Sequence, residues 1–336
     1  MKKLLLVIVF ISSILNTKAQ GVLRNVYPIG ESANVGYKTS MVPEIEKILF
    51  EANPIVRLAF FNTIQEDLEN DKNKTSALYL HFKPQIRMYH DNSKPVRMPS
   101  YHIGIAYQQL RRLKSINNAF VALAVESGHY SNGQDRSAFD PNLADGTPEA
   151  EALYDKINKD SDLSAMINRY SGNFSTNFTE LNVKYIQALG ELTGNNRPKS
   201  SFSVQFGYNR FHDRILWILP DIGGYTENDI KIYGKNRFKL GGDFMKMFNK
   251  DEDEMSDWSF DRYQVALNFN LIHKPHSYVN PFRTDLTGTV YFHNNLGLYV
   301  SGIYGHDNYN YRFVDSGFQL FTGLVFDPFP RIQWKR

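Results

Sequence analysis

The sequence contains no cysteine, so disulfide bonds and thiolate metal sites are excluded. It also carries almost no excess of charge, because 38 Lys and Arg stand against 35 Asp and Glu. Three of the basic residues, Lys2, Lys3 and Lys18, lie in the first 20 residues, which hold no acid, so the rest of the chain has 35 of each sign. This balance gives no indication of a nucleic-acid partner.

Apolar runs long enough for a membrane helix are missing as well. The run from Leu4 to Leu15 follows two lysines and precedes the small residue Ala19, which predicts a secretory signal peptide over residues 1–20, cleaved near Ala19 or Gln20. The run is shorter than the roughly 20 residues that a spanning helix needs, and no later segment reaches that length. If the exported chain enters a membrane, strands must cross it.

Aromatic residues, in contrast, are abundant. They make up 14% of the chain, with 24 Phe and 20 Tyr. Aromatic girdles at the two interfaces of a membrane barrel would account for this content. A large water-soluble β-protein would also be rich in aromatic residues, so composition leaves both classes open and periodicity has to decide.

Most of the chain alternates apolar and polar residues with the period of a strand. Clear examples are residues 56–61, 78–83, 102–107, 202–208, 265–271 and the last candidate strand, 317–326. Turn-rich stretches separate them, at residues 69–74, 194–199, 249–257 and 305–310. Roughly a dozen strands of about ten residues, without helical crossovers, predict an all-β, antiparallel transmembrane β-barrel of about 12 strands. We expect the barrel over residues 56–336 and an N-terminal arm over residues 21–55, where small and polar residues mix.

One long stretch interrupts the alternation. Thr147-Pro148-Glu149 predicts a helix start with proline in the first turn, and spaced apolar residues follow it up to Asn168. We interpret residues 135–172 as a partly helical loop inserted into the barrel. A solvated surface excursion is the favoured interpretation and a lid the alternative.

The stretch from Ser127 to Gly133 carries the chemistry. Side chains at i and i+2 of a strand leave the same face, so His129 and Ser131 can be neighbours, as a base and its nucleophile must be. They share parity with the apolar Leu123 and Val125. In a membrane barrel the pair would therefore face outward, toward lipid.

His129-Tyr130-Ser131-Asn132-Gly133 resembles the His-x-Ser-Asn-Gly signature of the outer membrane phospholipase A family, a twelve-stranded, calcium-dependent barrel with a Ser-His-Asn triad. Three further segments are similar to the family in the same order: Ser93 to Tyr101, Ser175 to Phe178, and Tyr304 to Phe326. The resemblance implies that Ser131 is the nucleophile, His129 the base and Asn177 the residue that orients it, with an oxyanion donor at Gly133. It spans nearly all of the mature chain.

The resemblance also implies a calcium ion and a partner. Its ligands would be the backbone carbonyl of Gln134, the side chain of Asn173 in place of a family hydroxyl, and Ser93 from the second copy of a homodimer. Asp221 and Glu227 are both conceivable as an acidic calcium residue. The implied substrates are phospholipids of the bacterial outer membrane, and we expect the monomer to be inactive.

The assignment of Asn177 has support from its own strand. In residues 175–189 the odd positions are the more apolar, so Asn177 shares the outward face of His129 and Ser131. An antiparallel neighbour that follows the insertion would bring it beside His129. Asn142 and Asn173 are the rivals, and Asn142 has no strand context.

Other polar groups have simpler interpretations. His273 and His276 flank Pro275 and are read as a polar turn, and Asp251 to Glu254 as a solvated loop, because the pattern of a calcium-binding loop is missing. The rival to an acyl hydrolase is a non-enzymatic outer-membrane barrel, either a pore or a structural protein, that keeps the fold.

Overall fold

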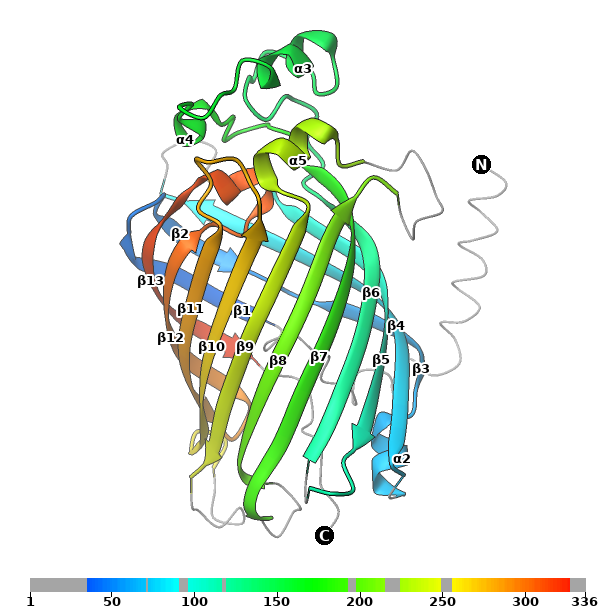
Figure 1. The fold of residues 1–336 in the computed structure, drawn as a ribbon. Helices are drawn as coiled ribbons and strands as arrows, with labels where there is room; N and C mark the ends of the chain where they lie inside the picture. Colours follow the sequence, from blue (N-terminus) through cyan, green and yellow to red (C-terminus); the bar gives the residue numbers. More distant parts are fainter. Residues whose placement is uncertain are drawn as a thin grey trace, which may run out of the picture.

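A computed structural model describes residues 35–70, 72–90, 96–116, 119–192, 198–214, 224–248 and 256–326 (Figure 1). All thirteen strands of this part of the chain belong to one antiparallel sheet. Their bounds are β1 Val35–Pro43, β2 Ile48–Ala52, β3 Val56–Asn62, β4 Lys74–Tyr89, β5 Ser100–Arg112, β6 Ala119–Ser131, β7 Ser175–Leu192, β8 Pro198–His212, β9 Asn236–Met247, β10 Phe260–His273, β11 Phe282–Phe292, β12 Leu296–His306 and β13 Ser316–Phe326.

The helices of the described residues are short and form no part of the sheet. They are α2 Ile64–Glu69, α3 Pro148–Tyr154, α4 Leu163–Met166, α5 Glu227–Tyr233 and the 3-10 helix η3 Asn310–Val314. None of them has the length and apolar character that a helix needs to cross a membrane. The predicted helix start is confirmed, because the Thr147 side chain caps α3 and Pro148 is its first residue.

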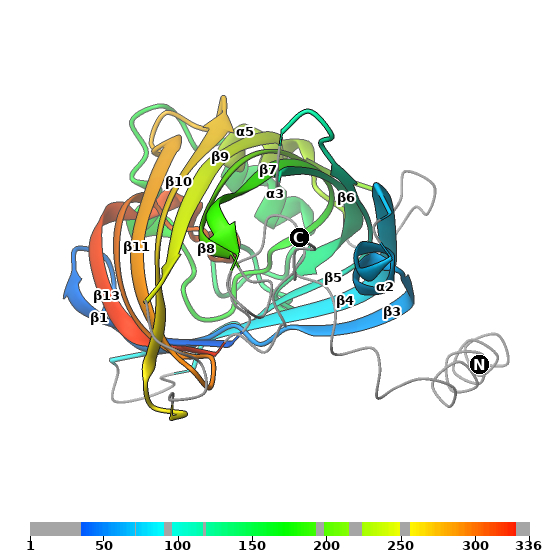
Figure 2. The ribbon, with the colours of Figure 1, turned by 90° about the horizontal axis from the view of Figure 1, so that it is seen from below.

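The sheet closes on itself into a twelve-stranded barrel. Strands that follow one another in the chain pair from β3 through to β13, β13 pairs with β1, and β1 with β2. β2 and β3 both pair with β4, β2 along its second half and β3 along its first, so the two form a single strand interrupted at residues 53–55. Seen along the axis, the strands form a ring (Figure 2). The predicted antiparallel barrel of about 12 strands is confirmed.

The predicted N-terminal arm is wrong for the described part of residues 21–55, because β1 and β2 belong to the wall. The strand period of β1 is broken by a register shift between Ser40 and Val42 against β13, so apolar and polar residues do not alternate through it. β2 has only five residues. Both features hide a strand from a search for ten-residue alternation. The predicted signal peptide lies outside the described residues.

The two faces of the wall are the reverse of those in a water-soluble protein. Large apolar side chains such as Leu181, Val204 and Phe206 are exposed on the outside. Their neighbours in the chain, including Asn182 and Ser203, are buried on the inside. An apolar exterior around a polar interior is the pattern of a transmembrane barrel.

The insertion covers the mouth of the barrel. α3 and α4 lie beyond the strand ends, on the same side as α5 (Figure 1). Phe139, Leu163 and Ile167 of the insertion pack in one apolar cluster with Tyr233 of α5 and Phe313 of η3. The favoured interpretation as a solvated excursion holds for only part of the insertion: residues 141–149 are largely exposed, whereas its apolar side packs on the mouth of the barrel.

Partly buried ion pairs hold the loops of this mouth together. Glu46, in the turn between β1 and β2, accepts from Arg312 and from Arg97, the latter at 2.7 Å. Arg169 of the insertion binds Asp315 at 2.7 Å. Burial acts to raise the pKa of Glu46, but the neighbouring arginines, Arg312 first, outweigh it and hold that pKa below its usual value. The charged carboxylate thus fixes loops from three parts of the chain.

Candidate active site

His129 and Asn177 face each other across neighbouring strands. They are direct register partners in the antiparallel pair β6 and β7, although the insertion separates them in the chain. The Nδ1 atom of His129 lies 2.9 Å from the Oδ1 atom of Asn177. An acceptor at Nδ1 keeps the proton on that nitrogen, an assignment that follows from the contact. The Nε2 atom is then free to accept a proton.

Ser131 follows two residues after His129 on the same outward face. It ends β6, in register with Tyr101 on one side and Ser175 on the other. Within the described part of the chain its hydroxyl makes no hydrogen bond, to His129 or to any other residue. Contacts between a nucleophile and its base are often loose without substrate.

The rival asparagines do not reach His129. Asn142 lies in the insertion, where its N–H donates to Asp140 at 2.8 Å. The side chain of Asn173 donates to the carboxylate of Asp145 at 2.6 Å. Among the three candidates, only Asn177 is placed to orient the imidazole.

Asn132 and Gly133, the last residues of the motif, shape the chain after β6. The buried Asn132 side chain donates to the carbonyl of Gly172 at 2.7 Å and accepts from the N–H of Phe174 at 3.0 Å. It thereby ties the end of β6 to the chain that enters β7. Gly133 has a φ of +67°, in the left-handed region that favours glycine. The role of Gly133 as an oxyanion donor stays a prediction.

The three residues belong to a larger set of polar side chains on the outer wall, which we call the polar strip. It consists of outward-facing residues at three successive register levels of β6, β7 and β8: Ser131 and Ser175; His129, Asn177 and His212; Ser127, Thr179 and Arg210. At the next level the wall becomes apolar, with the exposed side chains of Val125 and Leu181. The polar strip therefore interrupts the lipid-facing surface at the mouth end of the strands.

The sequence reasoning missed the β8 side of the polar strip. His212 and Arg210 share parity with Phe206 and Tyr208 of the alternating stretch 202–208, and Phe206 is exposed on the outer face. The same parity, continued to the end of the strand, would have placed both on the outer wall. The neighbourhood of His212 and Asn177 depends on the register in which β8 pairs with β7, and this register cannot be predicted from the alternation of residues.

The predicted calcium residues lie around the end of β6. Gln134 follows Gly133, and no described residue donates a hydrogen bond to its carbonyl oxygen. Asn173 is held nearby, because its N–H donates to the carbonyl of Arg136 at 2.6 Å. Its contact with Asp145 brings a carboxylate that the sequence reasoning had not singled out. Ser93 lies outside the described residues.

The acidic residues that were considered for calcium are differently placed. Asp221 and residues 251–254 lie outside the described residues. Glu227 is exposed in the first turn of α5. Within the described ranges, no three histidine or acidic side chains converge as a metal site. His276 links its turn to the insertion instead, with Nε2 3.0 Å from the carbonyl of Asn158.

Negative charge nevertheless gathers beside Asn173. Burial raises the pKa of Asp229 in α5 to about 6, and the carboxylates of Asp145 and Glu151 push it in the same direction. Glu151 is also joined to α5, since it accepts from Asn228. This part of the mouth favours a cation.

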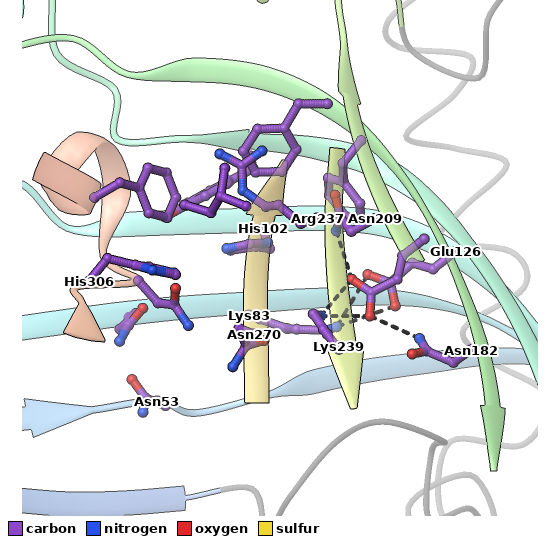
Figure 3. A pocket seen from close by; sticks show the side chains of 18 of the residues that line it. Asn53, Lys83, His102, Glu126, Asn182, Asn209, Arg237, Lys239, Asn270 and His306 are labelled. Carbon is purple, nitrogen blue, oxygen red and sulfur yellow. Dashed lines mark hydrogen bonds and ion pairs between the residues drawn. The ribbon is translucent and has the colours of Figure 1, made fainter. Parts of the chain in front are cut away.

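A polar cavity of about 330 Å³ lies behind the same wall, inside the barrel (Figure 3). Its carboxylates, Glu126 and Glu180, are register partners on β6 and β7. Each is neutralised by a lysine, Lys83 at 3.2 Å and Lys239 at 2.7 Å. These inward residues alternate with the outward His129 and Asn177 along the same two strands, so the ion pairs fix the wall that carries the candidate site.

No protein-family model and no curated protein matches the sequence. Among solved structures, the fold is similar to the calcium-bound dimer of the outer membrane phospholipase from Salmonella typhi, with a TM-score of 0.50 and 9% identity over 95% of this chain and 97% of that one. Outer membrane phospholipase A from Escherichia coli gives 0.49 and 10% over 88% and 94%. An outer membrane channel from Pseudomonas putida F1 gives 0.40 and 12% over 90% and 97%. The chain thus has the barrel fold of the outer membrane phospholipases.

Proposed function

We propose that the protein hydrolyses acyl ester bonds of phospholipids from the outer face of an outer-membrane barrel. The observation that carries the proposal is the 2.9 Å contact between His129 Nδ1 and Asn177 Oδ1, with Ser131 two residues further along the same lipid-facing strand. A buried carboxamide, an imidazole and a hydroxyl in this order form the working unit of a serine hydrolase.

Each residue has a defined task in this reaction. The Ser131 hydroxyl attacks the ester carbonyl and passes its proton to Nε2 of His129. When the tetrahedral intermediate collapses, the C–O bond to the lysophospholipid breaks and its alkoxide takes that proton. Water then attacks the acyl-enzyme with His129 again as base, releases the fatty acid and restores Ser131. Asn177 keeps the proton of the imidazole on Nδ1 throughout.

The location of the site suits a substrate that never leaves the bilayer. Acyl chains can lie along the exposed Val125 and Leu181 while the ester reaches the polar strip above them. An outward wall is only half of a cleft, whereas substrate sites usually bury most of the ligand. The apolar residues of the insertion pack over the mouth and not along this outward wall. We therefore propose that a second copy of the chain completes the site.

The residues at the end of β6 fit a calcium ion. The Gln134 carbonyl, the Asn173 side-chain carbonyl and the Asp145 carboxylate are the hard oxygen ligands that calcium prefers. Asn173 can turn its amide to present oxygen, since the two ends of the group have nearly the same shape. When bound, calcium would stabilise the negative charge that develops on the ester oxygen.

The rival function is a pore. The polar cavity inside the barrel favours it, because such an interior suits the passage of polar solutes. Ion pairs between Glu126, Lys83, Glu180 and Lys239 stand within that cavity, and the apolar cluster of the mouth lies above it.

Release of fatty acid from phospholipid–detergent micelles by the refolded protein tests the proposal. We expect activity that requires calcium, that Ser131→Ala abolishes, and that Ser76→Ala, an outward-facing serine far from the site on β4, leaves unchanged. Conductance of the same preparation in planar bilayers tests the rival. Steady conductance together with no fatty-acid release, with and without calcium, would replace the hydrolase by the pore.

A further inference from the structure

Asn177 is completely buried although it lies on the outer face of the barrel. In the sheet it has two register partners, His129 on β6 and His212 on β8. His212 therefore occupies the flank of Asn177 that His129 leaves open. It is itself only 4% exposed, so its imidazole is part of the wall around Asn177 and is closed to lipid.

A line of hydrogen bonds holds His212 in this position. Its Nε2 atom lies 3.0 Å from the hydroxyl of Thr179. That hydroxyl is 3.2 Å from the hydroxyl of Ser127, which donates to the carbonyl of Phe178 at 3.0 Å. The line crosses from β8 to β6 at the register level next to that of His129 and Asn177. Two neighbouring levels are about 7 Å apart along a strand.

The barrel itself does not need these polar groups. A lipid-facing wall is normally apolar, and a buried polar group is unfavourable there unless it is hydrogen-bonded. The next level of the same strands follows this rule with Val125 and Leu181. His212, at the level of His129 and Asn177, and Thr179, one level further, are therefore explained by the triad and not by the wall.

The orientation of the Asn177 amide is what such a neighbour can control. The two ends of a carboxamide have nearly the same shape but opposite hydrogen-bonding character. With Oδ1 toward His129 the imidazole keeps its proton on Nδ1. With the amide reversed, the NH₂ group would face Nδ1 and favour the tautomer that cannot accept the proton of Ser131.

We propose that His212 is a positioning residue for the triad. Fixed by Thr179, its polar ring selects the amide orientation that presents Oδ1 to His129, which an aliphatic side chain at this flank cannot do. The inference rests on the proposed function and adds a fourth residue to its catalytic unit. His212 acts through Asn177 and touches neither the substrate nor Ser131.

The test compares His212→Leu and His212→Gln with the control His273→Leu. His273 is the last residue of β10 and pairs with β9, away from the triad. We expect His212→Leu to lower kcat by about tenfold at unchanged KM, which is within the range of couplings between neighbouring residues and does not exceed the loss expected when the Asn177 amide itself is removed. His212→Gln, which retains a polar flank, should recover most of the rate. His273→Leu should keep the rate of the wild-type protein.

Two further measurements separate positioning from a merely structural role. In an Asn177→Ala background, His212→Leu should cause no further loss, because the residue acts through the missing amide. The ¹⁵N shifts of the His129 ring should report the Nδ1–H tautomer in the wild-type protein and a mixture in His212→Leu. An equal loss in both backgrounds, or an unchanged tautomer, would overturn the proposal. The ring shifts can be measured even if the protein releases no fatty acid, so the two proposals can fail separately.

Discussion

Replacing Asn177 by alanine removes one acceptor from His129 and removes no charge. The contact that is lost is a neutral hydrogen bond of 2.9 Å between two strands. The consequence for catalysis should therefore be smaller than in a triad whose third member is a carboxylate, which also stabilises the imidazolium ion. This difference can be given a size.

A neutral hydrogen bond contributes about 0.5–1.5 kcal/mol net, which corresponds to a factor of up to about ten in rate. Without the acceptor, both tautomers of His129 are populated, and about half of the molecules hold the proton on the wrong nitrogen. Together the two effects predict that kcat falls by about 5-fold to 20-fold. Removing the nucleophile, in contrast, typically lowers kcat by a factor on the order of 10⁶.

The assay is the initial rate of fatty-acid release at saturating calcium, corrected for the folded fraction by the heat-dependent gel mobility of the barrel. Asn236→Ala is the matched control, since Asn236 is an asparagine near the mouth end of β9 that accepts from Tyr208 at 2.8 Å. A loss for Asn177→Ala as large as that for Ser131→Ala would refute the reasoning, and so would no loss at all.

Ser131→Ala and His129→Ala should each lower hydrolysis by a factor on the order of 10⁶ with unchanged gel mobility, because the two act as a unit; wild-type turnover in either would remove that residue from the mechanism. Asp145→Asn should raise the calcium concentration for half-saturation about tenfold, measured by displacement of luminescent terbium, whereas the control Asp140→Asn should leave it unchanged. Equal midpoints for the two variants would exclude Asp145 as a ligand. Calcium should bind more weakly as the pH falls through about 6, since Asp229, with its raised pKa, is charged above that pH and neutral below it. Asp229→Asn should flatten this step, and an unchanged step would assign it to another group. Chemical crosslinking across a calcium titration should rise in parallel with turnover, and full activity in a monomeric preparation would contradict the dimer.

The parts of the fold that follow strict alternation could be predicted from the sequence. The alternating stretches 78–83, 202–208 and 265–271 lie within β4, β8 and β10. β1 escaped because its register shifts after Ser40, and β2 because it is short. Periodicity detects neither feature, since both are decided by pairing with strands distant in the chain.

The candidate site also contains residues that the sequence predicts and residues that depend on the pairing of distant segments. His129 and Ser131 are two residues apart, so their common face follows from the sequence alone. Asn177 needed a parity argument as well as the assumption that β7 pairs with β6 beyond the insertion. His212 and Asp145 could not be found, because one depends on the register of a third strand and the other on the path of a loop.

The placement of His129 and Asn177 on different strands makes activity a consequence of assembly. If β7 slipped by one residue against β6, every side chain of β7 would change face, and Asn177 would point into the lumen. The amide and the imidazole meet only after the chain on both sides of the insertion has found its final pairing. If the proposed function holds, a chain still in transit to the membrane carries the residues of a lipase before it has the activity of one.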